Sequence, residues 1–95
     1  MREEIQRFSW RFFGRVQGVG FRLACQRAAL ARRVSGWVRN EPDGSVLMEA
    51  EGPPQVLIDL LKALRDHTVG ARVDRVDERV VSPRRGAGEH FDITY

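Results

Sequence analysis

The order of strand-like and helix-like segments predicts an α+β protein with the ferredoxin-like topology β-α-β-β-α-β. Two stretches have helical composition, at 21–32 and 55–67, and each lies between stretches with the alternating pattern of strands. A Pro-Asp-Gly turn at 42–44 separates the two β-α-β halves. We therefore expect a single domain over residues 1–95, a sandwich in which two helices cover one face of an antiparallel sheet.

The first two elements are a strand and a helix. In IQRFSWRFF (5–13), Phe8, Trp10 and Phe12 occupy alternate positions, which is the period of a half-buried strand. The stretch FRLACQRAALAR (21–32) contains no Gly or Pro and carries small apolar residues at helical spacing. It is predicted to be the first helix.

A β-hairpin is predicted next. Residues 34–39 favour a strand around Trp37, and the segment EPDGS at 41–45 has the composition of a tight turn. The segment VLMEAE at 46–51 follows as the returning strand.

The second half repeats the pattern of helix and strand. Two prolines at 53 and 54 precede the second predicted helix, QVLIDLLKALRDH (55–67). Its leucines share one face: Leu57, Leu60, Leu61 and Leu64. Residues 71–81 alternate less cleanly and are predicted to form a strand, 82–89 a loop, and 91–95 a last short strand.

Composition limits the class of protein. The chain is 42% hydrophobic and 31% charged, which is typical of a globular domain and too apolar for a disordered one. No apolar run approaches the roughly 20 residues that span a bilayer, and the N-terminus lacks the apolar core of a signal peptide, so we expect a cytoplasmic protein without membrane contact. We also expect a monomer. The single Cys25 and two histidines cannot supply a four-ligand zinc site, and we expect no metal and no cofactor.

A glycine-rich loop is the strongest candidate for a ligand site. GRVQGVGFR at 14–22 joins the first strand to the first helix, where loop N–H groups and the free amides of the helix converge. Arg22 lies in the first helical turn, where a cation is unfavourable unless an anion sits beside it. We predict that a phosphate or sulfate binds here, although a surface arginine and a structural turn are the alternatives. The glycine spacing matches neither common nucleotide-binding fingerprint.

Asn40 is a second candidate, at the end of the strand before the turn. Asparagine at this place usually forms a turn. In the predicted topology, however, its strand can lie beside the glycine loop, and its amide could then orient a water molecule without deprotonating it.

Four motifs together resemble the acylphosphatase family over essentially the whole chain: GRVQGVGFR at 14–22, GWVRN at 36–40, PDG at 42–44 and F-x-I-x-Y at 91–95. The resemblance implies a ferredoxin-like fold. It also implies a metal-free hydrolase that splits small acyl phosphates, such as carbamoyl phosphate or 1,3-bisphosphoglycerate, into a carboxylate and inorganic phosphate.

The family's site residues fall on matching positions. The resemblance implies that Arg22 binds the phosphate and that Asn40 positions the attacking water. It places the backbone cradle for the phosphate on four successive residues: Gln17, Gly18, Val19 and Gly20.

Three positions depart from the family's pattern. Arg33 stands where a glycine is common, so a left-handed helix end there would cost about 1 kcal/mol. Glu41 stands where an apolar or hydroxyl residue is more frequent, and its carboxylate could repel an anionic substrate. The usual Gly-Pro before the strand at 71–81 is replaced around residues 68–70.

Two other functions fit the same topology. An RNA-binding module would need exposed aromatic residues on the central strands beside a basic stripe, and the strand at 5–13 has aromatic residues without the RNP pattern. A noncatalytic accessory module, like the acylphosphatase-like segment of hydrogenase-maturation proteins, would keep the glycine loop within a larger machine. The net charge of +3 is too small to choose between them, and we expect a small-molecule partner and no nucleic acid.

Overall fold

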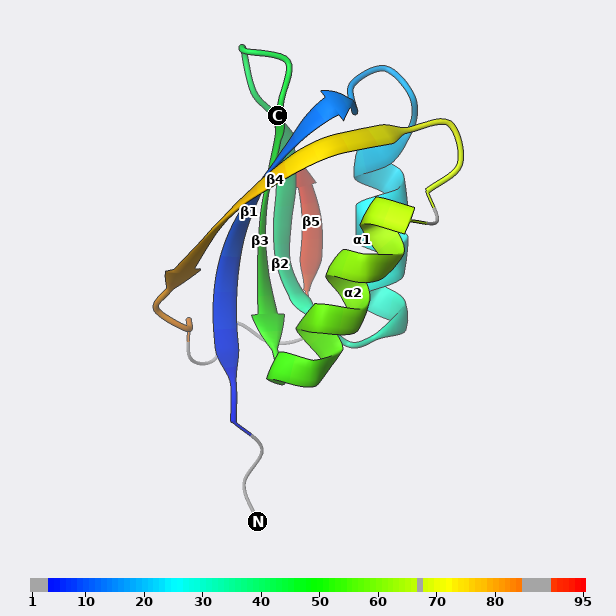
Figure 1. Cartoon of the computed structure of the whole chain (residues 1–95). Helices are drawn as coiled ribbons and strands as arrows, with labels where there is room; N and C mark the ends of the chain where they lie inside the picture. The colour runs from blue at the N-terminus through cyan, green and yellow to red at the C-terminus, as the bar shows by residue number, and fades with distance from the viewer. Residues whose placement is uncertain (1–3, 67, 85–89) are drawn as a thin grey trace.

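The chain folds into one sheet and two helices (Figure 1). The structure is a computed structural model that describes residues 4–66, 68–84 and 90–95. The elements, in chain order, are β1 (Gln6–Arg15), α1 (Phe21–Ala31), β2 (Ser35–Asn40), β3 (Val46–Gly52), α2 (Pro54–Asp66), β4 (Arg72–Val81) and β5 (Phe91–Thr94). The predicted order of elements is confirmed.

The sheet has the strand order β4-β1-β3-β2-β5. The first four strands are antiparallel to their neighbours, as predicted, but β5 runs parallel to β2, with Gly36 opposite Phe91. The sheet is therefore mixed. The direction of β5 follows from where β4 stops, because the last residue of β4 and the first residue of β2 lie at the same end of the sheet. A strand that starts there must run in the direction of β2. The predicted loop at 82–89 lies partly outside the described residues.

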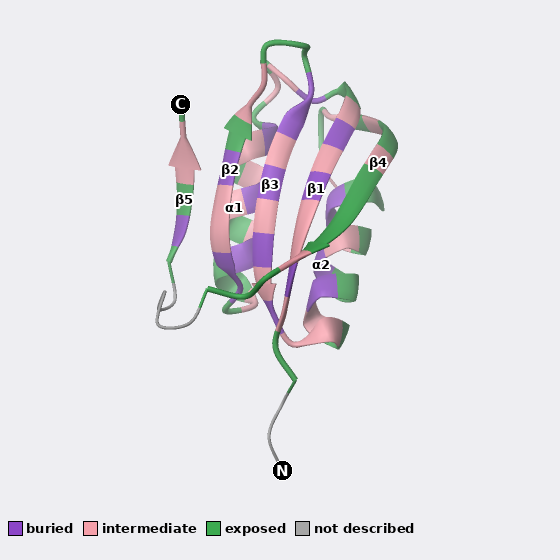
Figure 2. Cartoon of the chain, turned by 90° about the vertical axis from the view of Figure 1, so that its left-hand side faces the viewer, coloured by how far each residue is buried: buried purple, intermediate pink, exposed green. Residues whose placement is uncertain are grey.

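Both helices pack against the same face of the sheet, as Figures 1 and 2 show. The core between them contains Trp10 and Phe12 of β1, and Phe12 meets Phe21 of α1 edge to face, with ring centroids 5.1 Å apart. Burial of each phenylalanine contributes about 1.5–3 kcal/mol. The leucines Leu57, Leu60 and Leu64 of α2 close the core, while Leu61 is half-buried at its border.

Cys25 is a core residue of α1. It is a free thiol without exposed surface, and its burial raises its pKa. A protonated, inaccessible thiol is a poor nucleophile, so its role is packing.

The ends of the helices explain two departures in the sequence. Arg33 adopts the left-handed conformation, with a φ of 56°, and the backbone N–H groups of Arg32 and Val34 both donate to the carbonyl of Ala29. The left-handed conformation of Arg33 thus lowers the stability of the fold by about 1 kcal/mol relative to glycine, which adopts it without strain. After α2, the hydroxyl of Thr68 donates to the carbonyl of Leu64 over 3.0 Å and so satisfies one free carbonyl of the helix end. Residue 67, the last of the predicted second helix, lies outside the described residues.

The aromatic residues of β1 differ in their burial. Trp10 and Phe12 are buried against the helices, and Phe8 is half-buried beside them. The opposite face of the two central strands instead presents Ser9, Arg11 and other polar side chains together with Leu47. Phe13, the remaining ring of β1, is half-buried, and the guanidinium carbon of Arg75 lies 4.0 Å from its centroid. The described part of β1 thus has no fully exposed ring of the kind with which an RNA-binding sheet stacks on bases.

The described helices are also short. Neither α1 nor α2 is long and apolar enough to cross a membrane.

Candidate active site

A pocket of about 300 Å³ lies where the N-terminus of α1 faces the ends of β2 and β5. It brings together four of the residues that the sequence singled out, from segments far apart in the chain. Its lining residues are Val16, Gly18, Gly20, Phe21, Arg22, Leu23, Asn40, Ile93 and Tyr95. Arg22 and Asn40 therefore share one pocket with the glycine loop.

The glycines of the loop have different roles. Gly14 has a φ of +133°, and a Cβ there would collide with the carbonyl oxygen of Arg72 and lie 2.9 Å from the nitrogen of Asp74, so this glycine permits close approach of β4. Gly18 and Gly20 have φ values of +72° and +78°, and a Cβ on either would meet nothing within 4 Å. These two leave open space in front of the backbone, which a ligand can use.

The start of α1 is electropositive. Gly20 precedes the helix in a left-handed conformation, no side chain caps the end, and the first turn carries no acidic residue. The first intrahelical bond runs from the N–H of Ala24 to the carbonyl of Gly20, so the three N–H groups before it have no partner within the helix. These groups and the helix dipole, equivalent to roughly half a positive charge, favour an anion.

Arg22 lines the pocket. Its side chain is half-buried, and the guanidinium carbon lies 5.0 Å from the centroid of the Tyr95 ring. A cation over an aromatic face is attracted by the ring, and stacking leaves the edge of the guanidinium free to donate. Arg22 lies in the same pocket as Gly18 and Gly20, and its binding of phosphate stays a prediction.

Asn40 is the last residue of β2, and its carboxamide oxygen is buried without a hydrogen-bond partner. It is the one side-chain atom so identified within the described ranges 4–66, 68–84 and 90–95. An unpaired buried acceptor costs about 1–3 kcal/mol, so such atoms are rare and are often functional. Asn40 lines the pocket, and its carboxamide oxygen has no partner among the described residues.

Two residues of the predicted cradle are not among the lining residues. Gln17 turns its side chain away from the pocket, and its amide donates to the carbonyls of Glu41 and Ser45 over 2.8 and 2.9 Å. Val19 is half-buried and packs against the core. Conversely, the apolar lining by Leu23, Ile93 and Tyr95 was not predicted.

Sequence comparison agrees with this geometry. A model of the family described as Acylphosphatase matches residues 8–93. The chain belongs to the acylphosphatase family.

Individual acylphosphatases are similar over nearly the whole chain. A protein named acylphosphatase from Nitratidesulfovibrio vulgaris (strain DP4) is 50% identical over 92 residues, covering 96% of this chain and 92% of the relative. One from Synechococcus sp. (strain CC9902) is 44% identical over 91 residues, covering 96% of this chain and 76% of the relative. The crystal structure of acylphosphatase from Bacillus subtilis superposes with a TM-score of 0.87 at 33% identity, covering 95% of this chain and 99% of that one.

The fold also occurs as part of a larger protein. Full-length HypF, crystallised in a phosphate- and nucleotide-bound form, matches all of this chain with 12% of its own length, at a TM-score of 0.85 and 22% identity. At this identity the likeness shows a shared fold.

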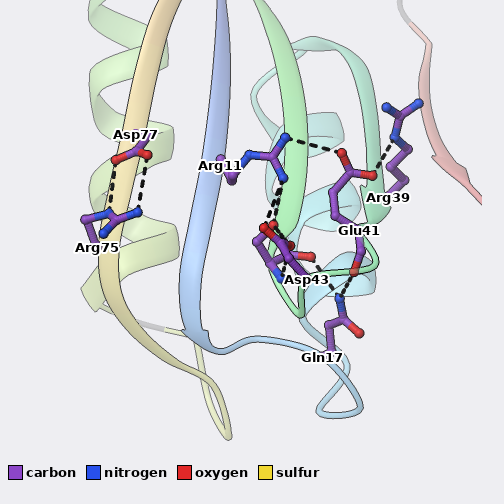
Figure 3. A network of polar contacts seen from close by, with 8 residues as sticks. Arg11, Gln17, Arg39, Glu41, Asp43, Arg75 and Asp77 are labelled. Carbon is purple, nitrogen blue, oxygen red and sulfur yellow. Dashed lines mark hydrogen bonds and ion pairs between the residues drawn. The ribbon is translucent and has the colours of Figure 1, made fainter.

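Glu41, whose carboxylate was expected to repel an anionic substrate, does not line the pocket. Its oxygens lie 3.4 Å from Nη2 of Arg11 and 3.2 Å from Nε of Arg39, on the opposite face of the sheet (Figure 3). The Glu41 side chain is 15% exposed and forms ion pairs with two guanidinium groups. The predicted repulsion of an anionic substrate is therefore weakened by both direction and charge.

Residues 4–66, 68–84 and 90–95 include no group of three or more His, Cys, Asp or Glu side chains that could hold a metal ion. The independence of this acylphosphatase from metals stays a prediction, to be tested by chelation.

Proposed function

We propose that this chain hydrolyses the carboxyl–phosphate bond of small acyl phosphates without a metal ion. Arg22 and the backbone N–H groups of the loop bind the phosphoryl group, and Asn40 orients the attacking water. The loop residues assigned to this cradle are Gln17, Gly18, Val19 and Gly20. The observation that carries the proposal is the unpaired, buried oxygen of Asn40 in the same pocket as Arg22 and the free helix amides.

The chemistry requires few groups. Transfer of a phosphoryl group to water passes through a transition state whose charge lies on the phosphoryl oxygens, so positioned donors supply much of the catalysis. The P–O bond to the acyl group breaks as the bond from water forms, and the proton of the water passes to a phosphate oxygen or to solvent. The leaving carboxylate has a conjugate acid with a pKa of roughly 4, so it needs no general acid. Asn40 can accept a hydrogen bond from the water and aim it at phosphorus, but it cannot remove its proton.

Several features of the working protein belong to the same proposal. We propose a monomer in the cytoplasm whose partner is a small molecule and not a nucleic acid. Inorganic phosphate or sulfate should occupy the loop and compete with substrate, because each offers the same oxygens to Arg22 and the amides.

The proposal is tested by assaying benzoyl, acetyl and carbamoyl phosphate with excess EDTA in ¹⁸O-labelled water. We expect full activity with EDTA and one labelled oxygen in inorganic phosphate. Activity that EDTA abolishes and Mg²⁺ restores would contradict metal independence. Label in the carboxylate would place the attack at carbon and contradict the role of the loop.

The hydrolysis assay, together with measurements of phosphate binding and RNA binding, separates the other two functions. Phosphate binding without hydrolysis of any of the three compounds would indicate a noncatalytic accessory module. Strongly salt-dependent binding of RNA without hydrolysis would indicate an RNA-binding module.

A further inference from the structure

A network of polar contacts surrounds the turn between β2 and β3 (Figure 3), which begins directly after Asn40 in the chain. We call it the hairpin network. Its members are Arg11, Gln17, Arg39, Glu41, Asp43 and Ser45. None of them lines the pocket.

Glu41 is the residue that connects the network to β1 and β2. Its carboxylate pairs with Arg11 from β1 on one oxygen and with Arg39 from β2 on the other. Arg11 also donates to the hydroxyl of Ser45 over 2.9 Å. The two strands and the turn are thus held together on the open face of the sheet.

The backbone of Glu41 connects the same network to the phosphate loop. Its carbonyl accepts from the side chain of Gln17, and its N–H donates to the carbonyl of Ser45 over 2.9 Å. Gln17 directly precedes Gly18, which lines the pocket. One residue therefore links the loop, the turn and the end of β2.

The turn itself is closed by Asp43. Its carboxylate accepts from the backbone N–H of Ser45 over 2.9 Å and from the Ser45 hydroxyl. The hydroxyl bond is the main reason that the pKa of Asp43 is lowered, followed by the N–H bond and the nearby Arg11. Asp43 thus remains ionised to lower pH than an isolated aspartate, and the turn keeps its shape wherever the enzyme is assayed near neutrality.

We propose that Glu41 is a positioning residue for Asn40. Successive residues of a strand point to opposite faces, so anchoring Glu41 on the open face turns Asn40 toward the pocket. Gln17 fixes the distance between the strand end and the glycine loop at the same place. The inference rests on the proposed function, in which Asn40 orients the attacking water.

A purely structural role for Glu41 predicts that Glu41→Gln lowers kcat equally with and without the Asn40 side chain. Arg11 and Arg39 are 33% and 44% exposed, and pairs with such exposure contribute little to stability. Asp77 offers a matched control, because its pair with Arg75 (3.1 Å between Nε and Oδ1) lies on the same face but outside the hairpin network (Figure 3).

The test is a double-mutant cycle with Glu41→Gln and Asn40→Ala, measuring kcat for benzoyl phosphate and the inhibition constant of inorganic phosphate. We expect Glu41→Gln alone to lower kcat about threefold to tenfold and to leave phosphate inhibition unchanged. In the Asn40→Ala background the same substitution should change kcat less than about 1.5-fold, since nothing remains to be positioned. Asp77→Asn should match the unmodified enzyme in both measurements.

Equal loss of kcat from Glu41→Gln in both backgrounds, or no loss in the first, would overturn the inference and leave the proposed function intact. Full kcat in Asn40→Ala would instead contradict the proposed role of Asn40, and the inference with it. If Glu41→Gln does not fold, judged by circular dichroism, Gln17→Met tests the hydrogen bond that joins the glycine loop to the Glu41 carbonyl. It should lower kcat in the normal background only, and an equal loss in both would again overturn the inference.

Discussion

Replacing Arg22 by alanine is expected to lower kcat/KM for benzoyl phosphate by about 10²-fold or more, the usual scale for losing one donor to the transition state. Arg22 is the only cation among the described residues that line the pocket. Without it, the loop amides alone must hold the developing charge on the phosphoryl oxygens. Inhibition by inorganic phosphate should weaken in parallel, because the same guanidinium binds the ground state.

Arg27 is the matched control for this substitution. It lies on the same helix and is exposed, but it does not line the pocket. Arg27→Ala should leave kcat/KM within about twofold of the unmodified value, as is usual for surface substitutions away from a site. A loss of less than about tenfold in Arg22→Ala, or an equal loss in Arg27→Ala, would remove Arg22 from the phosphate site.

Replacing Asn40 by alanine is expected to lower kcat by about 10²-fold while phosphate still binds. The reason is the separation of tasks in the pocket. In the proposed mechanism Arg22 and the helix amides hold the phosphoryl group, whereas Asn40 orients the water. The inhibition constant of inorganic phosphate should therefore change less than about threefold.

The effect of Asn40→Ala on kcat, compared with its effect on the inhibition constant of inorganic phosphate, decides the role of Asn40. A loss of phosphate affinity at normal kcat would show that Asn40 binds substrate and does not orient water. Removing its buried oxygen should also not destabilise the fold, because this oxygen has no hydrogen-bond partner among the residues that the structure describes. A thermal melt of Asn40→Ala checks that a loss of rate does not come from unfolding.

Much of the fold could be predicted because local and global signals agree. The alternation of Phe8, Trp10 and Phe12 predicted a strand, and the same alternation places Trp10 and Phe12 in the core. The helix predicted at 21–32 is observed at Phe21–Ala31. The direction of β5 could not be predicted, since it depends on which edge of the sheet receives the strand after a crossover.

The site was predicted less completely than the fold. The motifs placed Arg22, Asn40, Gly18 and Gly20 near one another, and the pocket unites them. The direction of the Glu41 carboxylate could not be predicted, because it depends on Arg11 from another strand. Tyr95 was missed as well, although its alternation with Ile93 indicated a shared face of the last strand.

The central claim is that the loop and Arg22 enclose a phosphoryl group in front of Asn40. The most direct measurement is a titration of ¹⁵N-labelled protein with inorganic phosphate, followed by two-dimensional NMR. We predict saturable shifts of the backbone amides of 17–21, the Arg22 guanidinium and the Asn40 carboxamide, all with one dissociation constant. Shifts confined to the arginines of the open sheet face, such as Arg11 and Arg79, without shifts of the loop amides would contradict the claim that the loop encloses phosphate.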